Sequence, residues 1–74
     1  MTSITEFAKG DHVRIKALEC EQEFKRRLAE MGLFDGAEVE IIKNDRKSPL
    51  LIKIFDSKIV LGQAGAKNIY GEKV

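Results

Sequence analysis

The chain has 74 residues, and its 13 basic and 12 acidic side chains leave a formal net charge of only +1. A dedicated nucleic-acid binder usually carries a strongly basic face, so this balance argues against nucleic acid as a partner. One cysteine allows no internal disulfide and the apolar runs are too short to span a bilayer, so we expect a single cytoplasmic domain over residues 1–74.

The first ten residues predict one short helical turn. Ser3 and Glu6 have the spacing of a capping box, in which the Ser3 side chain accepts from the Glu6 amide and the Glu6 side chain reaches back. Ile4 and Phe7 lie three residues apart and share a face, and Gly10 ends the turn.

The next segment, HVRIKAL at residues 12–18, alternates apolar and polar side chains. This period of two predicts a half-buried strand. Val13, Ile15 and Ala17 fall on one side of the strand and are expected to face the core.

From residue 20 to residue 31 the apolar period changes to that of a helix. Cys20, Phe24, Leu28 and Met31 fall in one narrow stripe, which predicts the buried face of a single main helix. We expect this helix to cover one side of the core.

Two adjacent arginines lie on the same helix. Arg26 points nearly opposite to the apolar stripe, and Arg27 lies at its edge, where Glu23 has the i,i+4 spacing of a favourable ion pair with it. Such side chains are most often a solvated helix face. The alternative is a contact for an acidic partner surface, because arginine pairs well with carboxylates.

The stretch MGLFDG after the helix predicts a helix stop and a turn. Gly32 suits the position after the helix end, where a left-handed backbone is needed, and Leu33 would then contact Leu28 as in a Schellman motif. Asp35 and Gly36 form a turn signal before the next strand.

The second half of the chain predicts short strands joined by tight connections. Val39 and Ile41 point inward from a strand that begins near residue 37, and the polar stretch KNDRKSP follows as a loop. Residues 50–55 and 58–61 form a hairpin, 63–67 a short turn, and 68–74 a last strand. Five strands and one main helix indicate a mainly β fold, a small and partly open five-stranded barrel.

The strand LLIKIF carries apolar side chains on both faces. Ile52 shares a face with Leu50 and Ile54, which leaves Leu51 and Phe55 on the other side with Lys53. Either the N-terminal turn covers that second face, or Leu51 and Phe55 form an apolar patch suited to a partner. We expect partial covering, because the apolar residues of the N-terminal turn need a surface against which to pack.

The sequence offers little for catalysis or metal binding. His12 and Cys20 are the only soft metal ligands and lie on different elements, whereas a zinc site needs three or four ligands. No nucleophile motif or phosphate-binding loop is present. We therefore expect no enzymatic activity, no cofactor and no metal site.

The order of these segments resembles one family, the small ferrous iron transport protein A (FeoA) domains. ITEFAKGDHVRI is similar to the opening of that family, and FKRRLAEMGLFDGAEVEII is similar to its most recognisable stretch. SPLLIKIFDSKIVL resembles the hairpin that follows. The resemblance covers almost the whole chain and implies an SH3-like barrel.

The resemblance also implies a function and a partner. FeoA proteins are generally regarded as accessories of FeoB, a large membrane protein that has a GTP-binding domain and takes up ferrous iron. We therefore expect binding to the cytoplasmic domain of FeoB at the inner face of the membrane, through Arg26, Arg27, Leu51 and Phe55. No nucleic acid, no direct insertion into the membrane, and a monomer or weak homo-oligomer are expected.

Two other classes remain open. One is an SH3-like regulatory domain related to metal-dependent transcriptional repressors, although the chain shows no DNA-binding helix pair. The other is a weak metal-binding chaperone, which should bring several ligands together. Asp35, Asp45 and Asp56 could contribute to such a site, but aspartates at these places are usually turn formers.

The resemblance weakens near the C-terminus. Family members usually carry a basic and then an acidic residue after the strand that ends at Leu61. This chain instead has LGQAGAKNI, with Gly62 and Gly65 near those places. A charged contact that relatives make there is therefore not expected.

Overall fold

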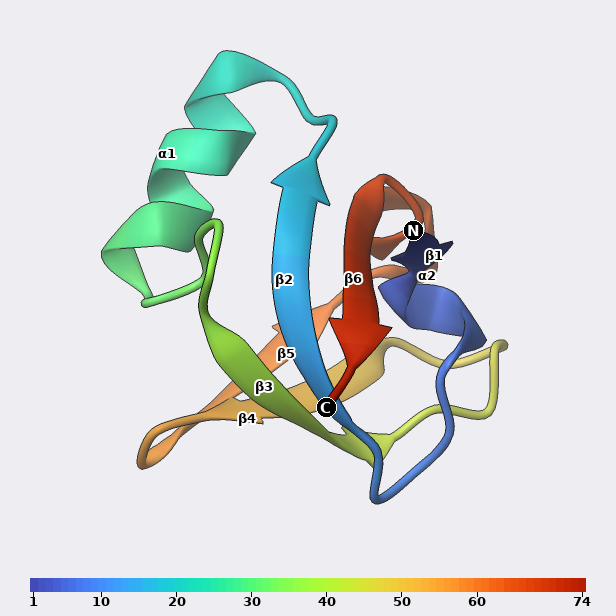
Figure 1. The fold of residues 1–74 in the computed structure, drawn as a ribbon. Helices are drawn as coiled ribbons and strands as arrows, with labels where there is room; N and C mark the ends of the chain where they lie inside the picture. Colours follow the sequence, from blue (N-terminus) through green and yellow to red (C-terminus); the bar gives the residue numbers. More distant parts are fainter.

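The structure, a computed structural model, describes residues 1–74. Six strands form one antiparallel sheet in the order β1-β6-β2-β3-β4-β5, and the sheet curls into a partly open, SH3-like barrel beside which α1 lies (Figure 1). The elements are β1 (Thr2–Ser3), the 3₁₀ turn η1 (Ile4–Glu6), β2 (His12–Leu18), α1 (Gln22–Glu30), β3 (Glu38–Lys43), β4 (Leu50–Ile54), β5 (Ser57–Leu61), α2 (Gln63–Ala66) and β6 (Ile69–Lys73).

The five predicted strands are all present, and the two-residue β1 is an addition at the sheet edge, where it pairs with β6. The predicted capping box is wrong. The Ser3 hydroxyl accepts from the backbone N–H of Thr5 at 3.3 Å, because the chain forms a tight 3₁₀ turn there. The Glu6 carboxylate instead lies 3.9 Å from the guanidinium of Arg46.

Strand β2 contains an irregularity that the alternation did not reveal. Val13 and Ile15 are fully buried as predicted. The pairing with β6 then shifts register between Ile15 and Ala17, so Leu18 turns into the core and Ala17 is only half-buried. A bulge moves later side chains to the other face, which corrects the prediction for Ala17.

The core is one continuous cluster of 16 buried apolar residues drawn from every strand except β1, and from α1, α2, η1 and the turns. Leu50, Ile52 and Ile54 of β4 face it, as the sequence predicts. Gly71 of β6 lies very close to β2, because a Cβ at this position would be 2.6 Å from the carbonyl oxygen of Arg14. The absence of a side chain thus lets β6 and β2 approach each other.

Helix α1 is shorter than the predicted segment of residues 20–31, and it is not long and apolar enough to cross a membrane; neither is α2. Leu28 is fully buried, and Cys20 and Phe24 pack against the core from partly buried positions. Met31 was expected in the buried stripe, but it caps the helix and is 45% exposed. The helix ends one residue before Met31, so the helical period no longer fixes its direction.

The end of α1 forms the predicted Schellman motif. Gly32 has φ +94°, its N–H donates to the Ala29 carbonyl at 3.0 Å, and the Leu33 N–H donates to the Leu28 carbonyl at 2.9 Å. Leu28 and Leu33 are both fully buried. These are the two hydrogen bonds and the apolar contact typical of the motif.

The turn after this stop is fixed to β2. The Ala37 N–H donates to the Phe34 carbonyl at 3.0 Å, with Asp35 and Gly36 between them, and Gly36 has φ +94°. The Gly36 N–H also donates to the Ile15 carbonyl at 2.7 Å. The corner therefore places α1 and the start of β3 relative to the sheet.

The segment after β5 was expected to be a turn, but it forms the four-residue helix α2. Gly62 is the N-cap of α2, and a Cβ at Gly65 would lie 3.3 Å from the ring of Phe24. Of the two glycines at the place where the chain departs from the FeoA pattern, Gly65 thus allows α2 to lie close to Phe24 of α1, whereas a Cβ at Gly62 would meet no atom within 4 Å.

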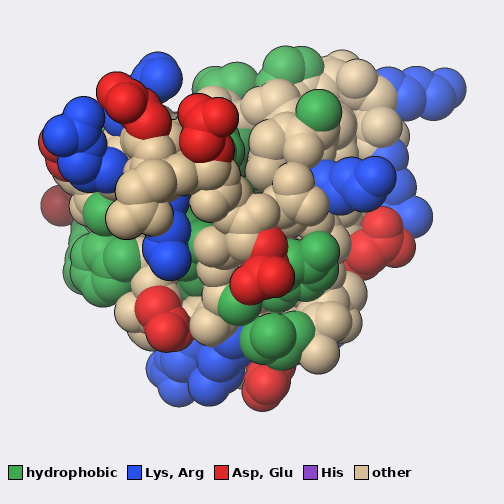
Figure 2. Space-filling model, turned by 90° about the horizontal axis from the view of Figure 1, so that it is seen from above, with side chains coloured by type: hydrophobic (Ala, Val, Ile, Leu, Met, Phe, Trp, Pro, Cys, Tyr) green, Lys and Arg blue, Asp and Glu red, His purple; other side chains and the backbone are tan.

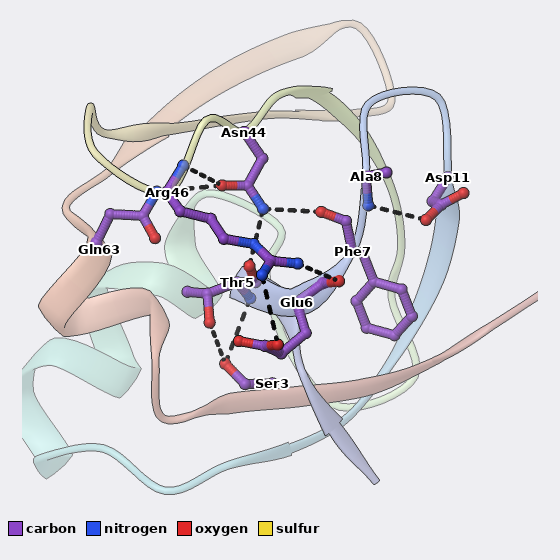
Figure 3. A network of polar contacts seen from close by, with 9 residues as sticks. All are labelled: Ser3, Thr5, Glu6, Phe7, Ala8, Asp11, Asn44, Arg46 and Gln63. Atoms are coloured by element: carbon purple, nitrogen blue, oxygen red, sulfur yellow. Dashed lines mark hydrogen bonds and ion pairs between the residues drawn. The ribbon is translucent and has the colours of Figure 1, made fainter.

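A polar network attaches the N-terminal segment to the loop between β3 and β4 (Figure 3). The Asn44 side-chain amide donates to the Thr5 carbonyl at 2.9 Å and to the Phe7 carbonyl at 2.7 Å. Arg46 donates from its guanidinium to the Glu6 carbonyl at 3.2 Å, and from its backbone N–H to the Asn44 side-chain oxygen at 3.1 Å. We call this network the N-terminal clasp.

Candidate functional site

The two soft metal ligands lie on different elements. His12 is exposed on β2, with its Nδ1 4.0 Å from a carboxylate oxygen of Glu38. Cys20 is partly buried before α1, and burial raises the pKa of its thiol. No group of three or more His, Cys, Asp or Glu residues lies close enough to hold a metal ion.

The first predicted partner-binding surface is the exposed side of α1. Arg26 is 69% exposed, and its guanidinium lies 3.4 Å from the Glu23 carboxylate. The predicted pair between Glu23 and Arg27 is therefore wrong, because Glu23 pairs at i,i+3 and not at i,i+4. Arg27 is exposed and forms no ion pair.

This helix surface carries charges of both signs. Three consecutive basic residues, Lys25, Arg26 and Arg27, are preceded by two acidic ones, Glu21 and Glu23, and followed by a third, Glu30. Figure 2 shows basic and acidic side chains interspersed over the face that is seen from above, with no large area of one sign. Arg27 is therefore a hydrogen-bond donor without an ion-pair partner, on a helix surface whose positive and negative charges nearly cancel.

The second predicted surface is the outer face of the β4–β5 hairpin. Leu51 is half-buried there, whereas Phe55 is 82% exposed. The covering that we expected therefore does not extend to Phe55. Its ring borders a shallow hollow that His12, Glu40 and Lys53 also line.

Two residues of this hairpin, Lys58 and Val60, were missed by sequence reasoning, and Lys53 was placed on this face but not assigned to the site. Val60 is 65% exposed and stands directly opposite Leu51, and Lys53 stands directly opposite Lys58. Part of the signal was present in the sequence, because Lys58 and Val60 alternate with two buried apolar residues. The register was not predicted, because the expected strands 50–55 and 58–61 put the turn at residues 56–57, whereas the structure has it at Phe55 and Asp56.

The backbone of Phe55 is unusual. It has φ +55° and occupies the first of the two turn positions between Ile54 and Ser57. A bulky residue with positive φ is an outlier, because its Cβ crowds the backbone, and glycine, asparagine or aspartate usually fills such hairpin positions. The only other non-glycine residue with positive φ is Arg46, at +64°.

Two carboxylates outside these surfaces hold loops in place. The Ala8 N–H donates to Asp11 at 2.9 Å and, together with the ammonium of Lys73 at 3.3 Å, lowers the pKa of that carboxyl. The N–H groups of Ser48 and Lys47 donate to Asp45 at 2.7 and 2.9 Å and lower its pKa. Both carboxylates act on the fold of their own loops.

Almost the whole chain matches one known protein family. Residues 2–73 match the family described as FeoA domain. No curated protein sequence matches the chain.

Several solved structures are similar to the chain. Iron(II) transport protein A from Clostridium thermocellum is 31% identical, with a TM-score of 0.88 over 99% of this chain and 46% of that one. FeoA from Chlorobium tepidum is 19% identical, with a TM-score of 0.90 over 99% of this chain and 70% of that one. IdeR from T. acidophilum is 20% identical, with a TM-score of 0.86, and the match covers 99% of this chain and 34% of that one.

Proposed function

The chain belongs to the FeoA domain family, and from this premise we propose that it is a cytoplasmic accessory protein of ferrous iron uptake that binds the cytoplasmic domain of FeoB. Ferrous iron is the cargo of the transporter and not a ligand of this chain. The chain acts by binding and not by catalysis. The observation that carries the proposal is the family match, which spans residues 2–73.

The two exposed surfaces support a binding role. Arg27 on the helix surface is a guanidinium without an ion pair, and Phe55 on the hairpin is a large apolar side chain that is 82% exposed. Aromatic and arginine side chains are the residue types that contribute most to protein interfaces. Both surfaces lie on a barrel whose core is complete without a partner, so substitutions there can alter binding while the fold remains.

The likeness to IdeR concerns the fold alone at 20% identity. The match covers 34% of that protein, so it does not extend to most of the IdeR chain. We therefore rest the proposed accessory role on the family match and draw no repressor function from the likeness to IdeR.

The test measures binding of the full chain to the purified cytoplasmic domain of FeoB by calorimetry. Wild-type protein is expected to bind, and Arg26→Glu with Arg27→Glu is expected to weaken binding several-fold if the helix surface contributes. The matched control is Lys9→Glu with Lys67→Glu, which produces the same net charge at two exposed lysines without ion pairs.

The outcomes separate the parts of the proposal. No binding by wild-type protein, together with unchanged ferrous iron uptake in cells that lack the chain, would overturn the accessory role. Equal binding by the arginine variant and the control would remove the helix surface from the interface and leave the hairpin. Thermal melts of each variant check that the barrel is folded.

A further inference from the structure

The outer face of the β4–β5 hairpin holds two lysines that form no ion pair within the protein. Lys53 and Lys58 are directly opposite in the strand register, both are exposed, and neither forms an ion pair. Side chains at such positions have Cβ atoms about 4.5–5.5 Å apart, and like charges there are destabilising. The free protein thus keeps an unfavourable charge pair that an acidic group from outside would relieve.

Apolar side chains lie on both sides of this lysine pair. Leu51 and Val60 form the next cross-strand pair on the same face, and Phe55 projects at the hairpin turn. At about 3.3 Å per residue, Phe55 and Leu51 are separated by roughly 13 Å along the strand. From the turn toward the other end, the face is therefore apolar, then basic, then apolar.

The backbone of Phe55 indicates that its side chain has a use outside the fold. Its ring is 82% exposed, so it contributes little to the core, yet the residue holds φ at +55°. Backbone strain of this kind persists where function requires it, and it clusters at binding and catalytic sites. A glycine would relieve the strain but would present no ring to a partner.

The acidic groups around the lysine pair restrict the kind of partner. Asp56 is at the turn, and Glu40 stands opposite Lys53 on β3. Glu38 is already bound by Arg14 at 3.2 Å. A broad anionic surface, such as a membrane or nucleic acid, would meet Asp56 and Glu40 as well as the lysines and would be repelled by them.

A second copy of the chain is also a poor occupant. Two hairpin faces brought together would gather four lysines, and each added pair of like charges opposes association. A discrete segment with one acidic side chain matches the face better.

We propose that the hairpin surface, defined as Leu51, Lys53, Phe55, Lys58 and Val60, binds a protein segment in which an acidic side chain is flanked by apolar ones. The acidic group lies over the two ammonium groups, and the apolar side chains cover Phe55 on one side and Val60 on the other. The inference rests on the proposed function, since it assigns this segment to the cytoplasmic domain of FeoB.

The experiment measures the dissociation constant for that domain with three variants of the full chain. Lys53→Glu with Lys58→Glu is expected to weaken binding at least tenfold, and Lys53→Arg with Lys58→Arg to leave it within twofold. Lys58→Glu alone is expected to raise the melting temperature, because it places opposite charges across the pair while Lys53 keeps Glu40 opposite it on β3, and still to weaken binding. If these lysines served only the fold, the melting temperature and the affinity would not change in opposite directions.

Salt and a charge-matched control sharpen the test. Raising the NaCl concentration from about 50 to 300 mM should weaken binding of wild-type protein and have a smaller effect on the double glutamate variant. The control variant, Lys9→Glu with Lys67→Glu, should bind as wild type.

The outcomes distinguish this inference from the proposed function. If wild-type protein binds FeoB and the double glutamate variant binds equally well, the inference fails and the proposed function stands. If wild-type protein does not bind FeoB, both fail. Lysine-dependent binding to vesicles of phosphatidylcholine and phosphatidylglycerol, or lysine-dependent dimers in sedimentation, would overturn the choice of a protein segment.

Discussion

The loop between β3 and β4 and the turn between β4 and β5 both hold a residue with a side chain at positive φ, but only the loop compensates for it. Arg46, at +64°, donates its backbone N–H to Asn44 and its guanidinium to the Glu6 carbonyl. Phe55, at +55°, exposes 82% of its surface.

The difference shows that the same backbone conformation has two explanations. At Arg46, one hydrogen bond within the fold uses the guanidinium and another the backbone N–H, so the strain is offset inside the molecule. At Phe55 the fold supplies no comparable contact, so a benefit outside the fold is the better explanation. The following predictions test whether this contrast holds, from the largest expected effect to the smallest.

Asn44→Ala should remove the compensation at the β3–β4 loop. Its amide donates to two carbonyls, of Thr5 and Phe7, and its oxygen accepts from Arg46. Loss of these partly buried bonds should lower the free energy of unfolding by about 2–3 kcal/mol. Urea melts measure this loss, and Asn68→Ala, an exposed asparagine whose side chain makes no hydrogen bond, is the control.

If Asn44→Ala were as mild as the control, the N-terminal clasp would not stabilise the fold. The strain at Arg46 would then be as uncompensated as the strain at Phe55, and the contrast between the two connections would disappear.

Gly32→Ala should show what positive φ costs a residue that gains a Cβ. We expect a loss of about 1–2 kcal/mol, because the conformation is unfavourable for alanine and the new Cβ would lie 3.3 Å from a methyl group of Ile54. Gly36→Ala has the same φ of +94° and no atom within 4 Å of its Cβ. A smaller loss there, measured in parallel melts, would isolate the conformational part; equal losses would show that the Ile54 contact costs nothing.

These positions also show what the sequence could predict. The stop at Gly32 follows from residues within one turn of each other, so local spacing predicted it correctly. The bonds of Asn44 join residues 39 and 37 positions apart, and no local pattern reveals them. The five main strands came from alternation, whereas the bulge in β2 and the exposure of Met31 depend on tertiary packing.

In the candidate site, too, local features were predicted correctly and long-range ones were not. The sequence placed Phe55 and Leu51 on one face because the strand period is local. The pairing of Lys53 with Lys58 required the register of two strands, and the positive φ of Phe55 required the turn geometry. Arg27 was expected to pair with Glu23, but the rotamers in the folded protein give that carboxylate to Arg26.

Phe55→Gly should stabilise the protein. Glycine adopts positive φ without a Cβ clash, and a ring that is 82% exposed contributes little when lost, so we expect a gain of about 0.5–1 kcal/mol. Phe34→Gly is the control: Phe34 is 47% exposed without positive φ, and that change should destabilise. A loss for Phe55→Gly in urea melts would mean that the ring supports the fold, and its proposed role in binding would lose its main argument.

Acid unfolding should give the smallest effect, and it tests the β3–β4 loop that contains Arg46. The N–H groups of Ser48 and Lys47 donate to Asp45 and lower its pKa, and they are the first two N–H groups beyond Arg46. Because the folded pKa lies below that of the unfolded chain, about 4, the stabilisation is present above that value and is lost as the pH falls through the folded pKa.

Asp45→Asn keeps an oxygen acceptor but removes this titration. The variant should therefore lose less stability than wild type between about pH 5 and pH 2, although Asp11 still titrates in both. Asp56→Asn, in the turn beside Phe55, is the control, because the Asp56 carboxylate accepts no hydrogen bond and the substitution therefore removes none. If both variants lost equally little stability at low pH, the Asp56 carboxylate would also hold the turn, and the strain at Phe55 would be offset within the fold as it is at Arg46.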